Sequence, residues 1–316
     1  MKASNYWVSM PQEFWHYVRA LSENLGYSKR KVVLKHSEAE IKRGLTRLGL
    51  SAEALTTSTE AKFSLKDLES YFRFRAELIE GFIAQHLQTA EEAKALFEDV
   101  VQKYTCGYTF QSNKEGAENA RLYKVMGGVS AEAPYNKQKG SKRDIDFLTA
   151  TSNILISYHL KGKEFDQDPR RLPFFTEDGV IVGSMSRRMD GAFPTCTNPV
   201  SLWEFKCYYY TTTFGSKISD AIYIADLDGF ERAVIERETN SKLALTLFVD
   251  AYSTWMEQGK SYLCRIVDLL QRGAITDLVI GSEVLTAIPN LVEEWLDAEA
   301  TAGGSSEPSR APIDAI

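Results

Sequence analysis

Two short stretches carry the residues best suited to chemistry. Residues 201–210, S-L-W-E-F-K-C-Y-Y-Y, alternate along their length like a buried strand, and this alternation puts Glu204 and Lys206 on one face. Asp190 lies fourteen residues before Glu204, in the strand-like run S-R-R-M-D-G-A-F. Two carboxylates beside an ammonium, on neighbouring strands, provide oxygen ligands for a divalent metal and a charge that can orient a water molecule.

The Glu-x-Lys pattern alone does not indicate an active site; the surrounding sequence decides. It occurs four times, at Glu40/Lys42, Glu60/Lys62, Glu92/Lys94 and Glu204/Lys206. The first three lie in or beside helical or turn-like sequence, where residues two apart do not share a face. Only the fourth lies on an expected strand with an aspartate shortly upstream. Charges in so apolar a strand need partners or a metal.

An Asp followed by a strand-borne Glu-x-Lys resembles the active-site skeleton of the PD-(D/E)XK nuclease superfamily. The resemblance covers roughly residues 110–285, and it departs from the family pattern in having Met189 where a proline usually precedes the Asp. It implies that Asp190, Glu204 and the main chain of Phe205 bind Mg²⁺, with Mn²⁺ able to substitute. Lys206 would orient the attacking water or stabilise negative charge.

Members of this superfamily often carry a further glutamate on the helix before the first core strand. Residues 113–126 are expected to form such a helix, and Glu118 is our choice for the fourth catalytic residue, with Glu115 second. If the helix expected over 144–159 has this role instead, Asp144 or Asp146 would take its place.

The resemblance therefore predicts a Mg-dependent phosphodiesterase, a type II restriction-like deoxyribonuclease that acts on double-stranded DNA in restriction or phage defence. A repair or recombination nuclease is the nearest alternative, and a non-catalytic DNA-binding or assembly subunit of the same fold is another. A homodimer is compatible with this reading. The residues expected to contact DNA phosphates are basic: Lys137, Lys139, Lys142, Arg143, Arg187 and Arg188.

The elements that must position these residues indicate an α/β fold, a mixed central β-sheet flanked by helices. Residues 1–110 read as a helical N-terminal region that recognises DNA or dimerises, residues 111–300 as the nuclease core, and residues 301–316 as a disordered tail. Hydrophobic periodicity predicts helices over 11–24, 37–48, 67–88 and 89–104, with a capping box from Ser37 to Glu40. A hairpin around Asp178–Gly179 leads to Asp190, and after the Glu-x-Lys strand the pattern alternates helix and strand.

Composition also bears on DNA binding, on zinc and nucleotide sites, and on membrane association. The net charge is −6, but residues 101–171 carry a net +4, so an acidic total does not exclude DNA. The four cysteines and four histidines do not cluster as zinc ligands do, and no glycine-rich phosphate loop is present. No apolar run approaches the roughly 20 residues that span a bilayer, so we expect a cytoplasmic protein without membrane contact.

Overall fold

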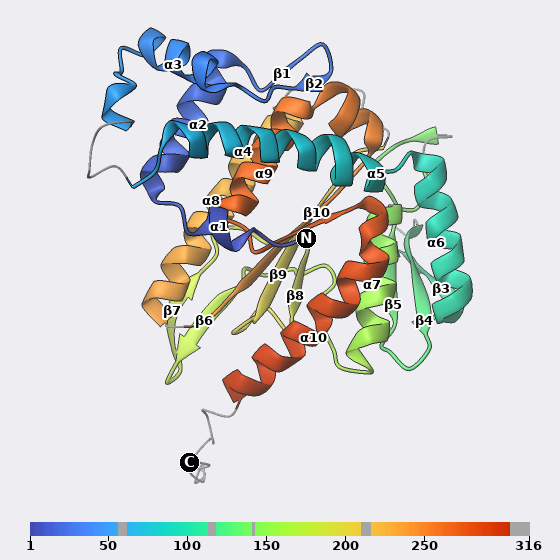
Figure 1. The fold of residues 1–316 in the computed structure, drawn as a ribbon. Coiled ribbons are helices and arrows are strands. Elements are labelled where there is room, and N and C mark those ends of the chain that lie inside the picture. The colour runs from blue at the N-terminus through green and yellow to red at the C-terminus, as the bar shows by residue number, and fades with distance from the viewer. Residues whose placement is uncertain (56–61, 113–117, 141–142, 210–215, 240, 304–316) are drawn as a thin grey trace.

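The computed structural model describes residues 1–55, 62–112, 118–140, 143–209, 216–239 and 241–303 (Figure 1). Its N-terminal part is helical, as predicted, and Ser37 and Glu40 form the predicted capping box. An aromatic cluster that includes Phe14, Trp15 and Tyr71 holds these helices together. The elements of this part are α1 (Asn5–Val8), α2 (Gln12–Leu25), β1 (Ser28–Lys29), β2 (Val32–Val33), α3 (Glu38–Arg47), the 3-10 turn η1 (Glu53–Leu55), α4 (Leu65–Leu78), the π-helical turn η2 (Ile79–Ile83) and α5 (Ala84–His86).

A three-stranded antiparallel sheet follows helix α6 (Ala90–Tyr104), in the order β3 (Thr105–Ser112), β4 (Glu118–Val125) and β5 (Ala131–Pro134). The helix predicted over 113–126 was wrong, because residues 118–125 form strand β4 and 113–117 lie outside the described residues. Its glutamates, lysine and alanines favour a helix locally, but pairing on both edges and burial of Ala120, Tyr123 and Val125 favour a strand. Tertiary context overrides local propensity here.

Helix α7 (Phe147–Leu160) confirms the helix predicted over 144–159, and Asp146 is its N-cap. It is buried on nearly every face because it lies between α6, β5 and α10 (Val284–Gly303). The hairpin predicted around Asp178–Gly179 is also present, as β6 (Phe174–Glu177) paired with β7 (Val180–Ser184).

The central sheet is four-stranded and mixed, in the order β11 (Asp277–Ile280), β10 (Ala244–Asp250), β9 (Ser201–Cys207) and β8 (Gly191–Phe193). Strands β9, β10 and β11 are parallel, and β8 is antiparallel to β9. Beyond β8, Asp166 and Ala192 exchange two backbone hydrogen bonds of 3.0 Å, which adds a single antiparallel bridge at this edge. The crossovers are α8 (Ser216–Thr239) and α9 (Lys260–Gln271), with the π-helical turn η4 (Ser253–Gln258) before α9 and the 3-10 turn η5 (Gly281–Glu283) before α10.

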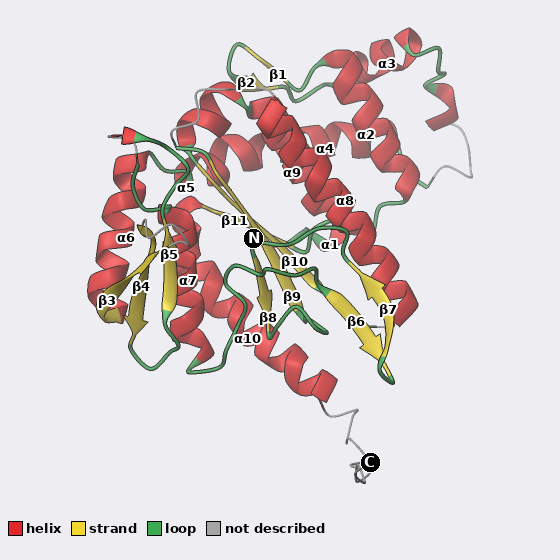
Figure 2. Cartoon of the chain, turned by 180° about the vertical axis from the view of Figure 1, so that it is seen from behind, coloured by secondary structure: helices red, strands yellow, loops and turns green. Residues whose placement is uncertain are grey.

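Helices cover both faces of this sheet, so the predicted α/β class with a mixed sheet is confirmed (Figures 1 and 2). Alternate residues of β9 enter two separate cores. Leu202 packs with residues of α8 and α9, whereas Trp203 packs with residues of α7 and α10. Helix α10 continues through Gly303, past the predicted start of the tail at Thr301, and residues 304–316 lie outside the described residues.

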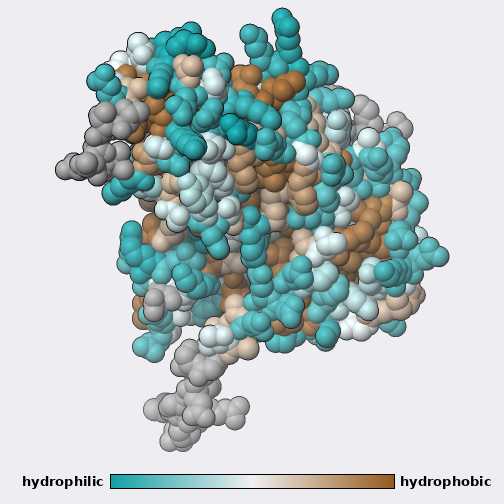
Figure 3. All heavy atoms as spheres, in the orientation of Figure 1, coloured by the Kyte–Doolittle hydropathy of each residue, from teal (hydrophilic) through white to brown (hydrophobic). Residues whose placement is uncertain are grey.

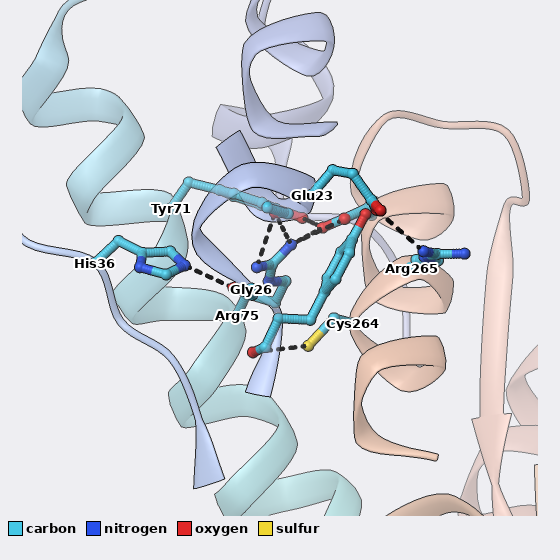
Figure 4. A network of polar contacts seen from close by, with 10 residues as sticks. Glu23, Gly26, His36, Tyr71, Arg75, Cys264 and Arg265 are labelled. Atoms are coloured by element: carbon cyan, nitrogen blue, oxygen red, sulfur yellow. Dashed lines mark hydrogen bonds and ion pairs between the residues drawn. The ribbon is translucent and has the colours of Figure 1, made fainter. Parts of the chain in front are cut away.

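A buried arginine joins the helical N-terminal part to the sheet-bearing part (Figure 4). Arg75 of α4 is 0% exposed and donates to the Asp268 carboxylate of α9 at 2.9 and 3.1 Å, and to the Ser22 hydroxyl of α2 at 3.2 Å. Burial lowers the pKa of this guanidinium, but Asp268, Cys264 and Tyr71 together more than offset that effect and the pKa is raised overall. Removing either partner would leave an uncompensated buried charge, so this contact fixes α4 on α9.

Hydrophilic side chains cover most of the face shown in Figure 3, with apolar patches between them. Among the residues that the structure describes, every helix is too short or too polar to cross a bilayer.

Candidate active site at the end of strand β8

Strand β8 begins at Gly191, which pairs with Trp203, so the last residues of β9 have no residue of β8 beside them. The candidate site forms at this end of β9. The Asp190 N–H donates to the Trp203 carbonyl at 3.1 Å, and two residues further along β9 the Asp190 side chain replaces the missing backbone partner. Its Oδ2 accepts the Phe205 N–H at 2.8 Å. The Phe205 carbonyl faces the same edge, because the N–H and C=O of one strand residue point to the same side.

Gly191 allows this edge to close tightly against β9. The Trp203 indole lies so close to Gly191 that a Cβ there would come within 1.9 Å of it. Any side chain at position 191 would therefore push β8 away from β9 and move Asp190 with it.

Glu204 and Lys206 lie on the same side of β9, as predicted, but their surroundings are buried. Glu204 is 9% exposed and Lys206 is 7% exposed, and the ammonium donates to Glu204 Oε1. The two charges therefore do not form an exposed pair on the sheet surface. Desolvation of a buried lysine and a buried carboxylate offsets much of their attraction, so stability alone is a weak explanation for this pair.

Arg187 provides a second cation for Glu204. Its Nη2 lies 2.9 Å from Glu204 Oε2, and its guanidinium makes a two-point contact with Asp228 of α8 at 2.8 and 2.6 Å. Arg187 was predicted to contact DNA, but the structure places its guanidinium against these two carboxylates. Asp228 was not predicted, because one acidic residue on an amphipathic helix gives no sequence signal.

Burial and the neighbouring charges shift the pKa of the Asp190 carboxyl. Burial raises the pKa of Asp190 to about 7, and the neighbouring Glu204 carboxylate contributes, against the lowering effects of the Phe205 N–H, Lys206 and Arg187. Paired carboxylates with a raised pKa are typical of catalytic and metal-binding sites, although ion-pair networks also produce them.

These residues line a cavity of about 530 Å³ between the central sheet and the β5–α7 segment. Asp190, Glu204 and Lys206 are on one wall, with Lys137 and Asp146 among the residues of the other. Sequence reasoning missed Glu132, Asn153 and Asp168, which also line it. Burial raises the pKa of Glu132, and the charge of Asp168 adds to this effect.

The candidates for the fourth catalytic residue differ in their positions relative to the cavity. Glu118 is exposed on β4 and does not line the cavity, Asp144 forms an ion pair with Lys94 at 3.8 Å, and Glu115 lies outside the described residues. Asp146 does line the cavity, and burial raises its pKa. The structure thus brings Asp146, not Glu118, to the site.

The basic residues predicted to contact DNA also differ in where they lie relative to the cavity. Lys137 lines the cavity and Lys139 is exposed beside it, whereas Lys142 lies outside the described residues. Arg143 is exposed, lies over the Tyr135 ring at 4.7 Å and donates to the Glu118 carbonyl. Arg188 is exposed, and its carbonyl accepts from Arg187.

The donor set fits a magnesium ion. In the described part of the chain, no three His, Cys, Asp or Glu side chains are close enough to enclose a metal by themselves. Mg²⁺ does not need such a cage, since it commonly takes one or two carboxylates and completes its shell with water and substrate phosphate. Glu204 Oε2 is buried beside Arg187 Nη2, 2.9 Å away, and accepts no other contact from a described residue, so one of its lone pairs is left for a ligand.

A buried carboxyl at the end of β10 adjoins the cavity through Tyr209. Asp250 is 0% exposed and accepts from the Gln88 N–H at 2.8 Å, the Ala251 N–H at 2.7 Å and the Tyr209 hydroxyl. Burial raises the pKa of Asp250 to about 7 in spite of the three donors.

This raised pKa predicts a pH dependence of stability. An acid with a folded-state pKa near 7 and an unfolded value near 3.9 binds more protons when folded between those values, so the free energy of unfolding falls as pH rises from about 4 to about 7. We expect the stability of wild type relative to Asp250→Asn to fall by a few kcal/mol, in order of magnitude, from pH 5 to pH 8. Urea denaturation of both proteins across this range measures it, and parallel curves would contradict it.

A family model described as a domain of unknown function (DUF7687) matches residues 88–295, which are 208 of the 316 residues. The chain belongs to this family. A second model, also of a domain of unknown function (DUF7690), matches residues 1–82. No curated protein and no solved structure matches the chain. Asp190, Glu204 and Lys206 all lie in the DUF7687 part, and the two matches meet in the segment of η2 and α5.

Proposed function

We propose that the chain is a metal-dependent DNA endonuclease of the PD-(D/E)XK type, which hydrolyses phosphodiester bonds in double-stranded DNA. The observation that supports it most is the placement of Asp190, Glu204 and Lys206 together at the open edge of β9, within one cavity. Each alone has an ordinary structural explanation. Together they have the residue types that the resemblance implies, with Asp190 directly before β8 and with Glu204 and Lys206 on β9.

The order of elements supports the same proposal. Helix α7, the bridge at Asp166, β8, β9, α8 and β10 come in this order, with the β6–β7 hairpin inserted between the bridge and β8. The bridge, β8 and β9 are successively antiparallel, and β10 is parallel to β9. This is the order that we expect of a restriction-endonuclease-like core around the Asp and Glu-x-Lys strands.

The charge of the cavity supports a role for a cation. Five carboxylates line it, against the ammonium groups of Lys137 and Lys206: Glu132, Asp146, Asp168, Asp190 and Glu204. A phosphodiester carries a negative charge and would be repelled by such a surface without neutralisation. Asp190, Glu204 and the Phe205 carbonyl would hold Mg²⁺ or Mn²⁺, which supplies charge neutralisation and a more acidic bound water.

The chain's own residues then have defined roles. Lys206 is held by Glu204, one of the proposed metal ligands, so it would orient the water and stabilise charge that develops on the phosphate. The Phe205 N–H fixes the Asp190 carboxylate in position. Lys137 lines the facing wall and would contact a neighbouring phosphate of bound DNA.

Plasmid cleavage by the full chain tests the proposal. We expect nicking or linearisation of supercoiled plasmid with Mg²⁺ or Mn²⁺, and none with EDTA or with Ca²⁺ alone. Restriction or phage defence is the use that we expect, and discrete fragments with defined ends would support it. DNA binding without any cleavage in Mg²⁺ or Mn²⁺ would contradict the proposed nuclease activity and favour a non-catalytic DNA-binding subunit.

A further inference from the structure

Helix α8 has two apolar faces, and the residues that the structure describes cover only one of them. Ile218, Ile222 and Ile235 are buried in the core beneath the helix. On the opposite side Tyr223 is 64% exposed, Leu227 is 47% exposed and Phe230 is 67% exposed. A surface helix normally presents polar residues to solvent, so this second face is unusual. Figures 1 and 2 both place α8 at an outer edge of the molecule.

The exposed residues follow a heptad repeat. Tyr223, Leu227, Phe230 and the partly exposed Val234 are spaced by four, three and four residues, and we call them the α8 seam. This is the spacing that keeps one stripe of a helix facing another helix along its length. Asp220 and Arg237, both exposed, extend the repeat by three residues at either end. From Asp220 to Arg237 the stripe is roughly 26 Å long, at 1.5 Å per residue.

The seam is complementary to itself when two copies run antiparallel. Its positions are symmetric about the point midway between Asp228 and Gly229. Around a twofold axis at that point, Leu227 faces Phe230 of the other copy and Tyr223 faces Val234. Asp220 then faces Arg237 at both ends, so opposite charges close the apolar stripe.

The buried side of α8 holds this seam rigidly. Gly229 packs so closely on the core that a Cβ there would lie 2.6 Å from the Ala274 carbonyl oxygen. Asp228 is 2% exposed and is anchored to Arg187. The seam therefore faces outward without rearrangement, which reduces the entropy lost on association.

We propose that the α8 seam is the interface of a homodimer in which two α8 helices pack antiparallel about a twofold axis. A second copy is favoured over an unrelated partner because apolar and charged positions match under one symmetry operation. The inference does not depend on the chemistry proposed above, since it concerns residues outside the cavity and is measured without metal or DNA.

The first test changes the seam. Sedimentation equilibrium in 0.15 M salt should give wild type twice the 35.6 kDa mass of the chain at micromolar concentration. Phe230→Glu should weaken the dimer by about 30-fold or more, as expected of a central aromatic. Phe110→Glu is the matched control, because Phe110 is 55% exposed on β3, and it should leave the dimer intact. A monomeric wild type, or an equal effect of both substitutions, would overturn the proposal.

The second test concerns the antiparallel register. Asp220→Arg or Arg237→Asp alone would place like charges together at both ends and should weaken the dimer about tenfold. The double variant Asp220→Arg/Arg237→Asp exchanges the charges and should restore wild-type affinity. Failure of this rescue, with circular dichroism showing all three variants folded, would exclude the register. Asp190→Asn should dimerise like wild type, so loss of cleavage and loss of association are distinguishable.

Discussion

Asp190→Asn and Glu204→Gln should each lower the single-turnover rate of DNA cleavage by at least about 10³-fold. Each substitution replaces a charged oxygen ligand by a neutral group of nearly the same shape. In Asp190→Asn the amide oxygen can still accept the Phe205 N–H, and in Glu204→Gln it can still accept from Lys206, so the fold should persist. Rates at saturating enzyme in Mg²⁺ measure the loss.

Asp277→Asn is the control for a buried carboxylate on the same sheet. Asp277 is 2% exposed on β11 and pairs with Lys2 at 3.0 Å, two strands away from β9. Its substitution should leave the cleavage rate within a few-fold of wild type. DNA binding in Ca²⁺ should persist in at least one of the two site variants. Wild-type cleavage by both site variants would remove these carboxylates from the mechanism.

Lys206→Met should retain DNA and metal binding but lose about 10²-fold or more in single-turnover rate. Methionine keeps most of the volume of the buried stem and removes the ammonium that is close to the expected reaction centre. A loss of this size matches the removal of one preorganised electrostatic group. Lys206→Arg should not restore the rate, because a planar guanidinium cannot occupy the place of a compact ammonium.

A structural ion pair would also be damaged by this substitution, so stability must be separated from rate. Breaking a buried pair costs about 3–5 kcal/mol whatever its purpose. Lys260 supplies the matched case, because it is 8% exposed and its ammonium binds both Glu80 oxygens at 2.8 and 2.9 Å, away from the cavity. Lys260→Met should lower stability and leave the rate unchanged at temperatures below unfolding. Equal rate losses in both variants would make Lys206 a structural residue.

The strand that bears Glu204 and Lys206 could be predicted because one of its faces is wholly apolar. Trp203, Phe205 and Cys207 alternate with the two charged residues, which leaves a period-two pattern, and the structure has the strand at Ser201–Cys207. The helices α2, α3 and α6 were equally predictable, because each has one apolar face and two of them begin with a capping box.

The opposite wall of the cavity could not be predicted. Glu132 and Asp168 have no local pattern that sets them apart from surface acids, and their proximity depends on how β5 and the segment after α7 pack. Glu118 was placed on a helix because its neighbours favour one, whereas pairing with β3 and β5 decides the conformation. The ion pair between Arg187 and Asp228 could not be predicted either, because it depends on where α8 crosses the sheet.

The indole of Trp203, next to Glu204 in the chain, lies parallel to that of Trp295 with ring centroids 5.1 Å apart and an interplanar angle of 2°. Both rings are almost fully buried. Two stacked chromophores in so rigid a setting couple their electronic transitions, which gives a circular dichroism signal that neither ring has alone. Because Trp203 also presses on Gly191, this signal responds to any separation of β8 from β9. The protein thus contains its own optical reporter, and an inactive variant that keeps the signal has lost a reacting group and not the packing beneath it.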